Sequence, residues 1–245
     1  MPSLAQQTEA PNPWISVDFV RDNSEAIVAA LRQHITLTVV SVGLGLLLAV
    51  PLALLARRYD WLRTPLLGAA GLLYTIPSLA LFAVLAPVTG LTATTVVIGL
   101  TGYTLLVLVR NVLTGLDGVP ADVVEAARGM GMGTGRLLLR VELPLALPAV
   151  LAGVRIATVS TVALVTVGVV VSNGGLGQLI FEGFNNNLYR AEIFTATALC
   201  VALALVADLL LIGLERLLTP WTRASGARRG AWSATPSSGC STGKV

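Results

Sequence analysis

Charged side chains are scarce in this 245-residue chain, in which 12% of the residues are charged and 55% are hydrophobic. So few charges cannot cover the surface of a soluble globule of this size. There are only two cysteines and one histidine. Cys200 falls in an apolar run and Cys240 in a polar tail, which excludes a sensible disulfide between them. His34 has no second ligand candidate near it in sequence, so we expect it at the outer membrane interface rather than in a metal site.

Two familiar signals are also missing. The glycine-rich segment 129–135 follows no predicted strand and precedes no Gly-Lys-Ser/Thr sequence, so it is not a phosphate-binding loop, and the chain cannot hydrolyse ATP itself. Residues 1–13 lack the basic and then apolar segments of a cleavable signal peptide. We therefore expect the first membrane span to act as an uncleaved insertion signal, and we expect no catalytic residues and no cofactor bound by this chain.

Long apolar runs fill most of the remaining sequence. Each is close to the roughly 20 residues that cross about 30 Å of hydrocarbon as a helix. Because helices that are apolar on all faces suit lipid rather than water, we predict an all-α membrane protein with about five transmembrane helices. The predicted spans are residues 35–56, 66–88, 92–109, 148–171 and 194–214.

These spans divide the chain into three parts. Residues 1–33 form an extracytoplasmic segment, in which 14–33 have the pattern of an amphipathic helix on the outer surface. Residues 34–216 form the transmembrane domain, with a cytoplasmic loop at about 117–147 between the third and fourth spans. Residues 217–245, rich in Ser, Gly, Ala and Arg, are expected to be a disordered cytoplasmic tail.

Basic residues are distributed unevenly between the two sides of these spans. One side carries Arg57, Arg58, Arg63, Arg128, Arg136, Arg140, Arg216, Arg223, Arg228, Arg229 and Lys244. The other side carries only Arg21, Arg32 and Arg190, together with an excess of acidic residues. The positive-inside rule therefore places the N-terminus outside and the C-terminus in the cytoplasm. The net charge of +3 follows from this bias, so we expect no nucleic-acid partner.

A polar, glycine-punctuated island at residues 125–148 interrupts the apolar sequence. Val123, Val124 and Ala127 recur at helical spacing after Pro120, which predicts a short amphipathic helix. The glycines at 129, 131, 133 and 135 favour a tight turn, and a second helix is expected from about residue 137. Two prolines, at 144 and 148, are expected to break or bend the chain where it re-enters the membrane.

The anchors of this island identify a family. They are, in order, Glu125, Ala126, Ala127, Gly131, Leu143, Pro144 and Pro148. Their spacing resembles the cytoplasmic Glu-Ala-Ala loop in permeases of bacterial binding-protein-dependent ABC importers, and every anchor of that loop is matched. The resemblance implies that the first helix of the loop docks on a separate cytoplasmic ATPase, which uses the ATP, and that these seven residues serve the coupling. An ordinary polar connector is the alternative interpretation.

Four shorter motifs, at residues 33–37, 75–80, 110–111 and 174–177, extend the resemblance over roughly residues 30–216. They look like the glycine betaine/carnitine/choline branch of these permeases, although Tyr74 stands where that branch commonly has Gln. This implies import of a quaternary-ammonium solute across a bacterial cell membrane, with an extracytoplasmic binding protein and an identical or similar permease subunit. A permease for another solute, such as methionine or a sulfonate, is one alternative. A secondary transporter or channel is another, from a different class.

Tyr74, Pro77 and Ser78 lie near the middle of the second predicted span. A proline there permits a kink, which a transport protein can use to shape a pathway. The Tyr74 ring also offers an aromatic face to a quaternary ammonium ion. Ordinary helix packing, with the tyrosine hydroxyl bonded to a neighbour, is the alternative.

Arg155 and Asp208 are ionisable residues inside predicted spans. Each lies about two helical turns from the same membrane boundary, so an intramembrane ion pair between them is expected. An unpaired charge in hydrocarbon is costly, and such residues usually face a partner or an aqueous path. Snorkelling of the arginine to the cytoplasmic surface is the competing interpretation.

Overall fold

The computed structural model describes residues 12–172 and 174–221, and this part of the chain is all-α, which confirms the predicted fold class. Most of the predicted tail, including Cys240, lies outside the described residues. The helices are α1 (Val17–Asp22), α2 (Ser24–Arg58), α3 (Asp60–Thr75), α4 (Ser78–Thr89), α5 (Ala93–Asp117), α6 (Ala121–Gly129), α7 (Thr134–Leu137), the π turn η1 (Leu138–Glu142), α8 (Leu143–Val167), the 3-10 turn η2 (Gly168–Val170), α9 (Leu176–Asn185) and α10 (Arg190–Leu218).

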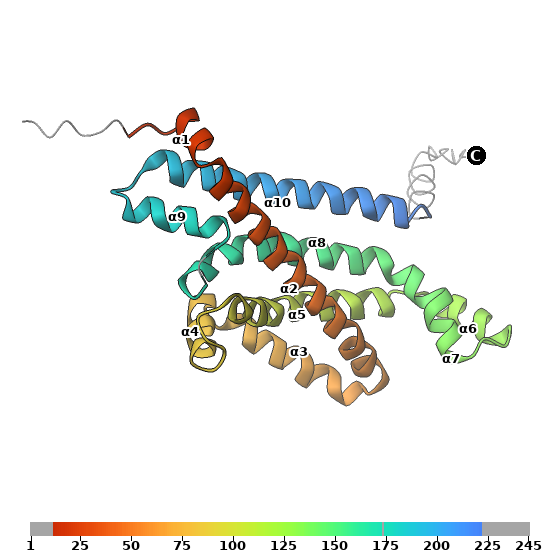
Figure 1. Cartoon of the computed structure of the whole chain (residues 1–245). Helices are drawn as coiled ribbons and strands as arrows, with labels where there is room; N and C mark the ends of the chain where they lie inside the picture. The colour runs from red at the N-terminus through yellow and green to blue at the C-terminus, as the bar shows by residue number, and fades with distance from the viewer. Residues whose placement is uncertain (1–11, 173, 222–245) are drawn as a thin grey trace, which may run out of the picture.

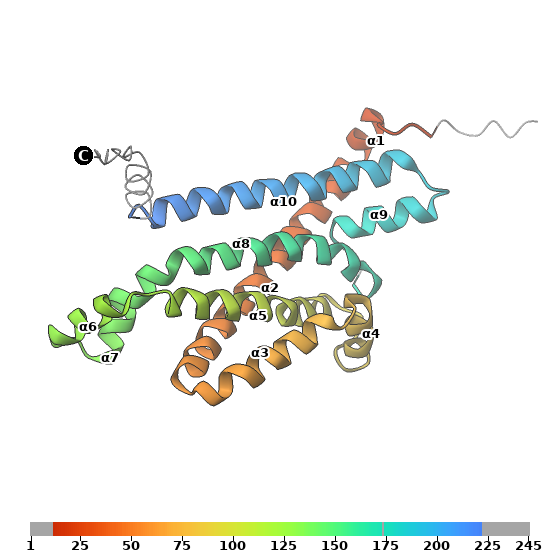
Figure 2. The same ribbon diagram turned by 180° about the vertical axis from the view of Figure 1, so that it is seen from behind.

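Four long helices build the bundle. α5 packs against both α2 and α8, and α10 packs against α8 and α9 (Figures 1 and 2). Figure 1 shows α6 and α7 together at one end of the bundle, the α6 end, and α1 and α9 at the opposite end, the α9 end. Among the described residues, α2, α5, α10 and the continuous segment Thr134–Val170 are each long and apolar enough to cross a membrane.

The second predicted span, residues 66–88, is not one straight helix. It divides into α3 and α4, which are bent by 97° relative to each other. Ile76 between them has an extended backbone (φ −66°, ψ 128°), because the ring of Pro77 disfavours helical geometry in the preceding residue. The hydroxyl of Tyr103 on α5 donates a hydrogen bond to the Ile76 carbonyl at this break. In the described part of the chain the predicted count of five spans is reached only if this bent pair is one span.

The first span starts earlier than the sequence predicts. α2 begins at Ser24 and runs to Arg58, so residues 24–33 belong to the long helix and not to a separate surface helix. Only α1 stands apart, with the Ser16 hydroxyl accepting a hydrogen bond from the Phe19 N–H at its start. The expected boundary at residue 34 is therefore not a boundary in the helical structure.

The two prolines at the start of α8 do not break the chain. α7, η1 and α8 follow one another without interruption, and α8 runs through both Pro144 and Pro148. Pro144 lies in the first turn of α8, where helices tolerate proline best. The irregularity lies just before it, in the π turn, where the Leu143 N–H bonds to the Leu138 carbonyl.

The glycine-rich segment after α8 contains a helix that the sequence analysis misses. Gly174 and Gly175 form the turn with positive φ angles of 140° and 68°, and α9 begins directly afterwards at Leu176. A Cβ on Gly177 would lie 2.5 Å from the carbonyl oxygen of Thr166, so glycine lets α9 approach α8 closely. The glycines thus serve a tight turn and close packing, and they do not prevent a helix.

Candidate coupling and translocation sites

The short helix α6 forms the tip of the α6 end. Pro120 precedes it, Asp122 lies in its first turn and Arg128 in its last, which suits the helix dipole. Glu125 and Ala126 are exposed, whereas Ala127 is buried. α6 contacts α7 and η1, so the helix has an inner face at Ala127 and an outer face free for a partner.

Gly131 forms the turn that ends this helix. Its φ angle is +81°, and its N–H donates to the Arg128 carbonyl at 2.9 Å. A Cβ at this position would meet nothing within 4 Å, so the backbone conformation, not lack of space, favours glycine. The other three glycines of the loop, at 129, 133 and 135, have no positive φ angle. Of the four glycines that were predicted to favour a tight turn, only Gly131 therefore adopts a backbone conformation that favours glycine.

Leu143, Pro144 and Pro148 lie half-buried in the first turns of α8. The same stretch of α8 crosses α5 very closely, because a Cβ on Gly115 would lie 2.7 Å from the Ala146 carbonyl oxygen. The helix that leads into the loop and the helix that leaves it are thus in direct contact. A displacement of the loop would reach both helices.

Two ion pairs at the α6 end were not predicted. Arg57, at the end of α2, makes a fork-to-fork contact with Glu142 of η1, with Nη1–Oε2 at 2.9 Å and Nη2–Oε1 at 3.0 Å. Arg63 of α3 contacts Asp117 at the end of α5, with Nη2–Oδ2 at 2.6 Å. The sequence analysis used both arginines only for topology. Glu142, which directly precedes the anchor Leu143, was the available hint in the sequence that an acidic partner for an arginine lies in this loop.

Tyr74, Pro77 and Ser78 lie together at the break between α3 and α4. The Tyr74 ring is 44% exposed and packs edge-on against Tyr103, with 5.8 Å between the ring centroids. Pro77 is exposed and Ser78 is half-buried at the start of α4. The Tyr74 ring therefore remains partly exposed beside a bend at the surface of this chain.

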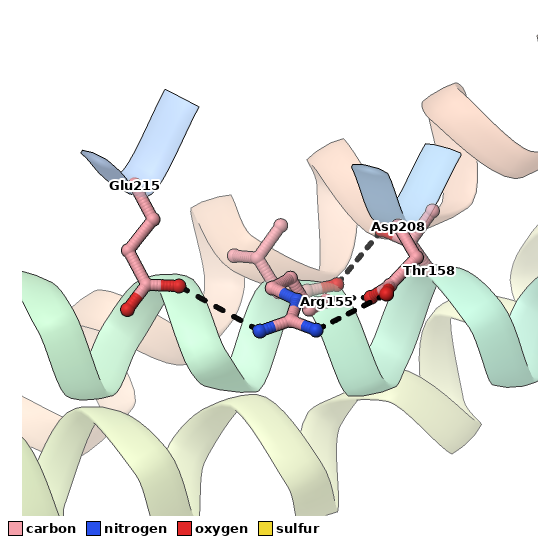
Figure 3. Close-up of polar contacts among 5 residues, drawn as sticks. Arg155, Thr158, Asp208 and Glu215 are labelled. Atoms are coloured by element: carbon pink, nitrogen blue, oxygen red, sulfur yellow. Dashed lines mark hydrogen bonds and ion pairs between the residues drawn. The ribbon is translucent and has the colours of Figure 1, made fainter. Parts of the chain in front are cut away.

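Arg155 on α8 and Asp208 on α10 are brought together. The Arg155 Nε and Nη2 donate to the two carboxylate oxygens of Asp208 at 2.9 and 3.1 Å (Figure 3). A second carboxylate, Glu215, lies 3.7 Å from Nη1 on the other side of the guanidinium. Sequence reasoning missed Glu215, although it follows Asp208 by two helical turns and therefore shares its face of α10. The pair borders an open cleft of about 510 Å³ between α8 and α10.

His34 was expected at the outer membrane interface, but its side chain is fully buried within the protein. Its Nε2–H donates to the Val162 carbonyl at 3.0 Å, and its Nδ1 accepts from the Leu176 N–H at 3.3 Å. The neighbouring Gln33 Oε1 accepts from the Gly175 N–H at 3.3 Å. These two residues of α2 therefore bind the start of α9. Within the described ranges, no group of three or more His, Cys, Asp or Glu side chains could hold a metal ion.

Comparison with protein families gives one match that covers most of the chain. Residues 41–224 match the family model described as binding-protein-dependent transport system inner membrane component. The osmoprotectant import permease protein OsmW of Salmonella typhimurium is 39% identical over 210 residues, covering 84% of this chain and 97% of the relative. The choline transport system permease protein OpuBB of Bacillus subtilis is 35% identical over 205 residues, covering 83% of this chain and 94% of the relative.

Solved structures show the same arrangement of helices. A chain of the MetNI methionine ABC transporter, in an inward-facing conformation, superposes with a TM-score of 0.71. The superposition covers 84% of this chain and all of that chain, at 21% sequence identity. At this level of identity the likeness concerns the fold alone.

Proposed function

Because the chain belongs to the family of binding-protein-dependent transport system inner membrane components, we propose that its α6 loop couples a cytoplasmic ATPase to the uptake of a quaternary-ammonium solute. The chain is a multi-pass inner-membrane permease of an ABC importer, and it is not itself catalytic. ABC systems hydrolyse ATP in a separate subunit, and dependence on a binding protein implies a second partner that delivers the solute.

The shape of α6 supports the coupling role. Glu125 and Ala126 face outward from a helix whose inner face, at Ala127, is already buried. Gly131 ends this helix in a conformation that other residues rarely adopt, and Leu143, Pro144 and Pro148 carry the loop into α8, which contacts α5 closely. An ATPase that binds α6 would therefore move two membrane helices at once. This movement would shift the population between an inward-facing and an outward-facing state of the transport path.

The solute class rests on the relatives and on Tyr74. Relatives named for osmoprotectant, choline and carnitine transport are 35–39% identical to this chain. The exposed face of Tyr74 is suited to a quaternary ammonium ion, a contact of about 0.5 to 2 kcal/mol. Methionine or a sulfonate remains the alternative solute, and uptake measurements separate the two. An identical or similar permease subunit would complete the path.

We also propose that the α6 end faces the cytoplasm and the α9 end faces outward, with the N-terminus outside. Arginines gather in and around the α6 loop, which fits the positive-inside rule. At the α9 end, Arg190 lies over the Trp14 ring at 5.0 Å, and Phe19 packs edge-on against Tyr189. Aromatic side chains are common at membrane–water interfaces.

The exposed outer face of α6 is the observation that carries this proposal, and charge reversal there tests it. Glu125→Lys should leave the protein in the membrane but abolish ATP-driven uptake of labelled choline, glycine betaine and carnitine in cells that also contain the ATPase and the binding protein. Labelled methionine and a sulfonate should not be taken up by the unaltered protein. Undiminished uptake in the variant would refute the coupling role, and uptake of methionine alone would refute the solute class.

A further inference from the structure

Both arms of the α6 loop are tied to one place, the corner between α2 and α3 (residues 57–63). The incoming arm is the end of α5, where the Asp117 Oδ2 lies 2.6 Å from the Arg63 Nη2. The outgoing arm consists of α7 and η1 and ends at Glu142, whose carboxylate accepts two hydrogen bonds from Arg57, of 2.9 and 3.0 Å. The loop therefore has a connection to α2 and α3 that does not run through the chain itself.

The two connections differ in strength. The side chains of Arg63 and Asp117 are 41% and 35% exposed, so water and salt screen this contact. The Glu142 side chain is 9% exposed, and its two carboxylate oxygens both face the Arg57 guanidinium. A bidentate arginine–carboxylate contact fixes orientation as well as distance. A carboxylate this buried tolerates loss of its partner poorly.

The Arg57–Glu142 pair lies next to a tightly packed core, which begins at Ala56, the residue before Arg57. Small residues of α2, Ala53 and Ala56, are fully buried there against Leu116 of α5 and Ala146 of α8. Close-packed interiors transmit displacement because they contain little free space. A movement of Glu142 would therefore shift the end of α2 rather than be absorbed.

The local backbone also serves this contact. Glu142 is the last residue of the π turn η1, and it is buried, whereas Leu139 and Arg140 in the same turn are exposed. π turns are rare and often occur at functional sites. Here the turn lies between α7 and α8, and within it Glu142 is the residue that faces α2.

We propose that Arg57 is a positioning residue for energy coupling, which holds the outgoing arm of the α6 loop to α2. A displacement of α6 then moves α2 together with α5 and α8. Without the pair, the ATPase still docks and hydrolyses ATP, but the displacement no longer reaches α2, and hydrolysis proceeds without uptake. This inference rests on the proposed coupling role of α6.

The test is the amount of solute imported per ATP hydrolysed, measured with the whole transporter in proteoliposomes. The vesicles contain this chain, its ATPase and the binding protein, and a mixture of labelled choline, glycine betaine and carnitine is supplied. Arg57→Gln and Glu142→Gln should each lower this ratio several-fold, while ATP hydrolysis continues. The swapped variant Arg57→Glu with Glu142→Arg should recover most of the ratio. Arg58→Gln, on the exposed neighbouring arginine, is the matched control and should not change it.

Each other outcome refutes the inference in a recognisable way. An unchanged ratio in both single variants shows that the pair does not position the loop. Single variants that no longer co-purify with the ATPase show that the pair serves assembly only. A swapped variant that stays uncoupled shows that the contact is not what matters. Failure of the coupling role itself is distinguished by Glu125→Lys, which would then import solute normally.

Discussion

The two ends of the bundle hold their carboxylates in different ways. Toward the α6 end, arginine side chains contact those of Asp117, Glu142 and Asp208. At the α9 end, the carboxylates of Glu182 and Glu192 accept hydrogen bonds from side-chain amides instead, at 2.7 and 3.2 Å. Ion pairs thus join separate helices where the ATPase is proposed to act. At the α9 end, the amide contacts stay within the α9–α10 hairpin.

The two ends also differ in how the side chains of α2 contact its neighbours. At the α9 end, Gln33 and His34 accept hydrogen bonds from the first N–H groups of α9 and its preceding turn. These N–H groups have no partner within their own helix, so a side chain from α2 satisfies them. The contact between α2 and the start of α9 is therefore made by two side chains that accept hydrogen bonds, without an ion pair. The α6 end is held by charges, and its tip at α6 is left open for a partner.

The largest expected effect concerns the turn at the open tip. Gly131→Val forces a β-branched residue into a left-handed conformation, at a cost of about 1 to 3 kcal/mol, and should misplace α6. ATP-driven uptake should fall to background while membrane insertion is unchanged.

Gly131→Asn is the matched control, because asparagine tolerates positive φ angles. It should retain most of the uptake. Equal loss in both variants would show that any side chain at this position blocks the partner, and the explanation by backbone conformation would then be wrong.

At the α9 end, His34→Ala should reduce stability most. The substitution leaves a cavity and strands the buried Leu176 N–H, which together should cost about 2 to 4 kcal/mol. Thermal unfolding in detergent measures this loss. Thr36→Ala, two residues along the same helix and exposed, is the control and should change stability little. A similar loss in both variants would contradict the role of His34 at the start of α9.

The Arg155–Asp208 pair predicts losses of stability that are not additive. Arg155→Ala leaves the Asp208 carboxylate without its partner, and Asp208→Ala leaves Arg155 with only the longer contact to Glu215, at 3.7 Å, whereas the double variant removes both members of the pair. The double variant should be no less stable in detergent than the poorer single variant. Additive losses would favour snorkelling of Arg155, or a contact of Asp208 with another subunit.

The smallest expected effect concerns Tyr74. If its exposed ring contacts the quaternary ammonium ion, Tyr74→Ala should raise the KM for uptake by roughly twofold to thirtyfold, and Tyr74→Phe should keep it nearly constant. Loss of maximal rate with unchanged KM would instead assign Tyr74 to packing against Tyr103.

The sequence predicted features that depend on local pattern. Apolar runs located the long helices, and helical spacing after Pro120 located α6, because lipid and helix geometry determine both. The juxtaposition of Arg155 and Asp208 followed from equal depth in two helices. The break at Pro77 was foreseen as a kink, but its angle of 97° also involves a contact with Tyr103 that no local pattern reveals.

Features that depend on contacts between distant segments were missed. His34 is separated from Val162 and Leu176 by well over a hundred residues, so its burial could not be read from its neighbours in sequence. In the sequence, Glu142 is one of several charged residues in a polar loop. Its contact with Arg57 appears only in the folded structure, where the end of α2 lies beside η1. α9 was not predicted because it is short and lies outside the long apolar runs, and the need for Gly177 arises only where α9 touches α8.

Photo-crosslinking from α6 tests the central claim most directly. A photoreactive phenylalanine analogue is placed at Ala126, on the exposed face of α6, or at Asn187, in the exposed turn between α9 and α10. We predict that irradiation of membranes containing the whole transporter joins the ATPase to the Ala126 variant and not to the Asn187 variant. An adduct with the ATPase at Asn187, or none at Ala126 in a complex that still imports solute, would contradict the assignment of α6 as the coupling helix.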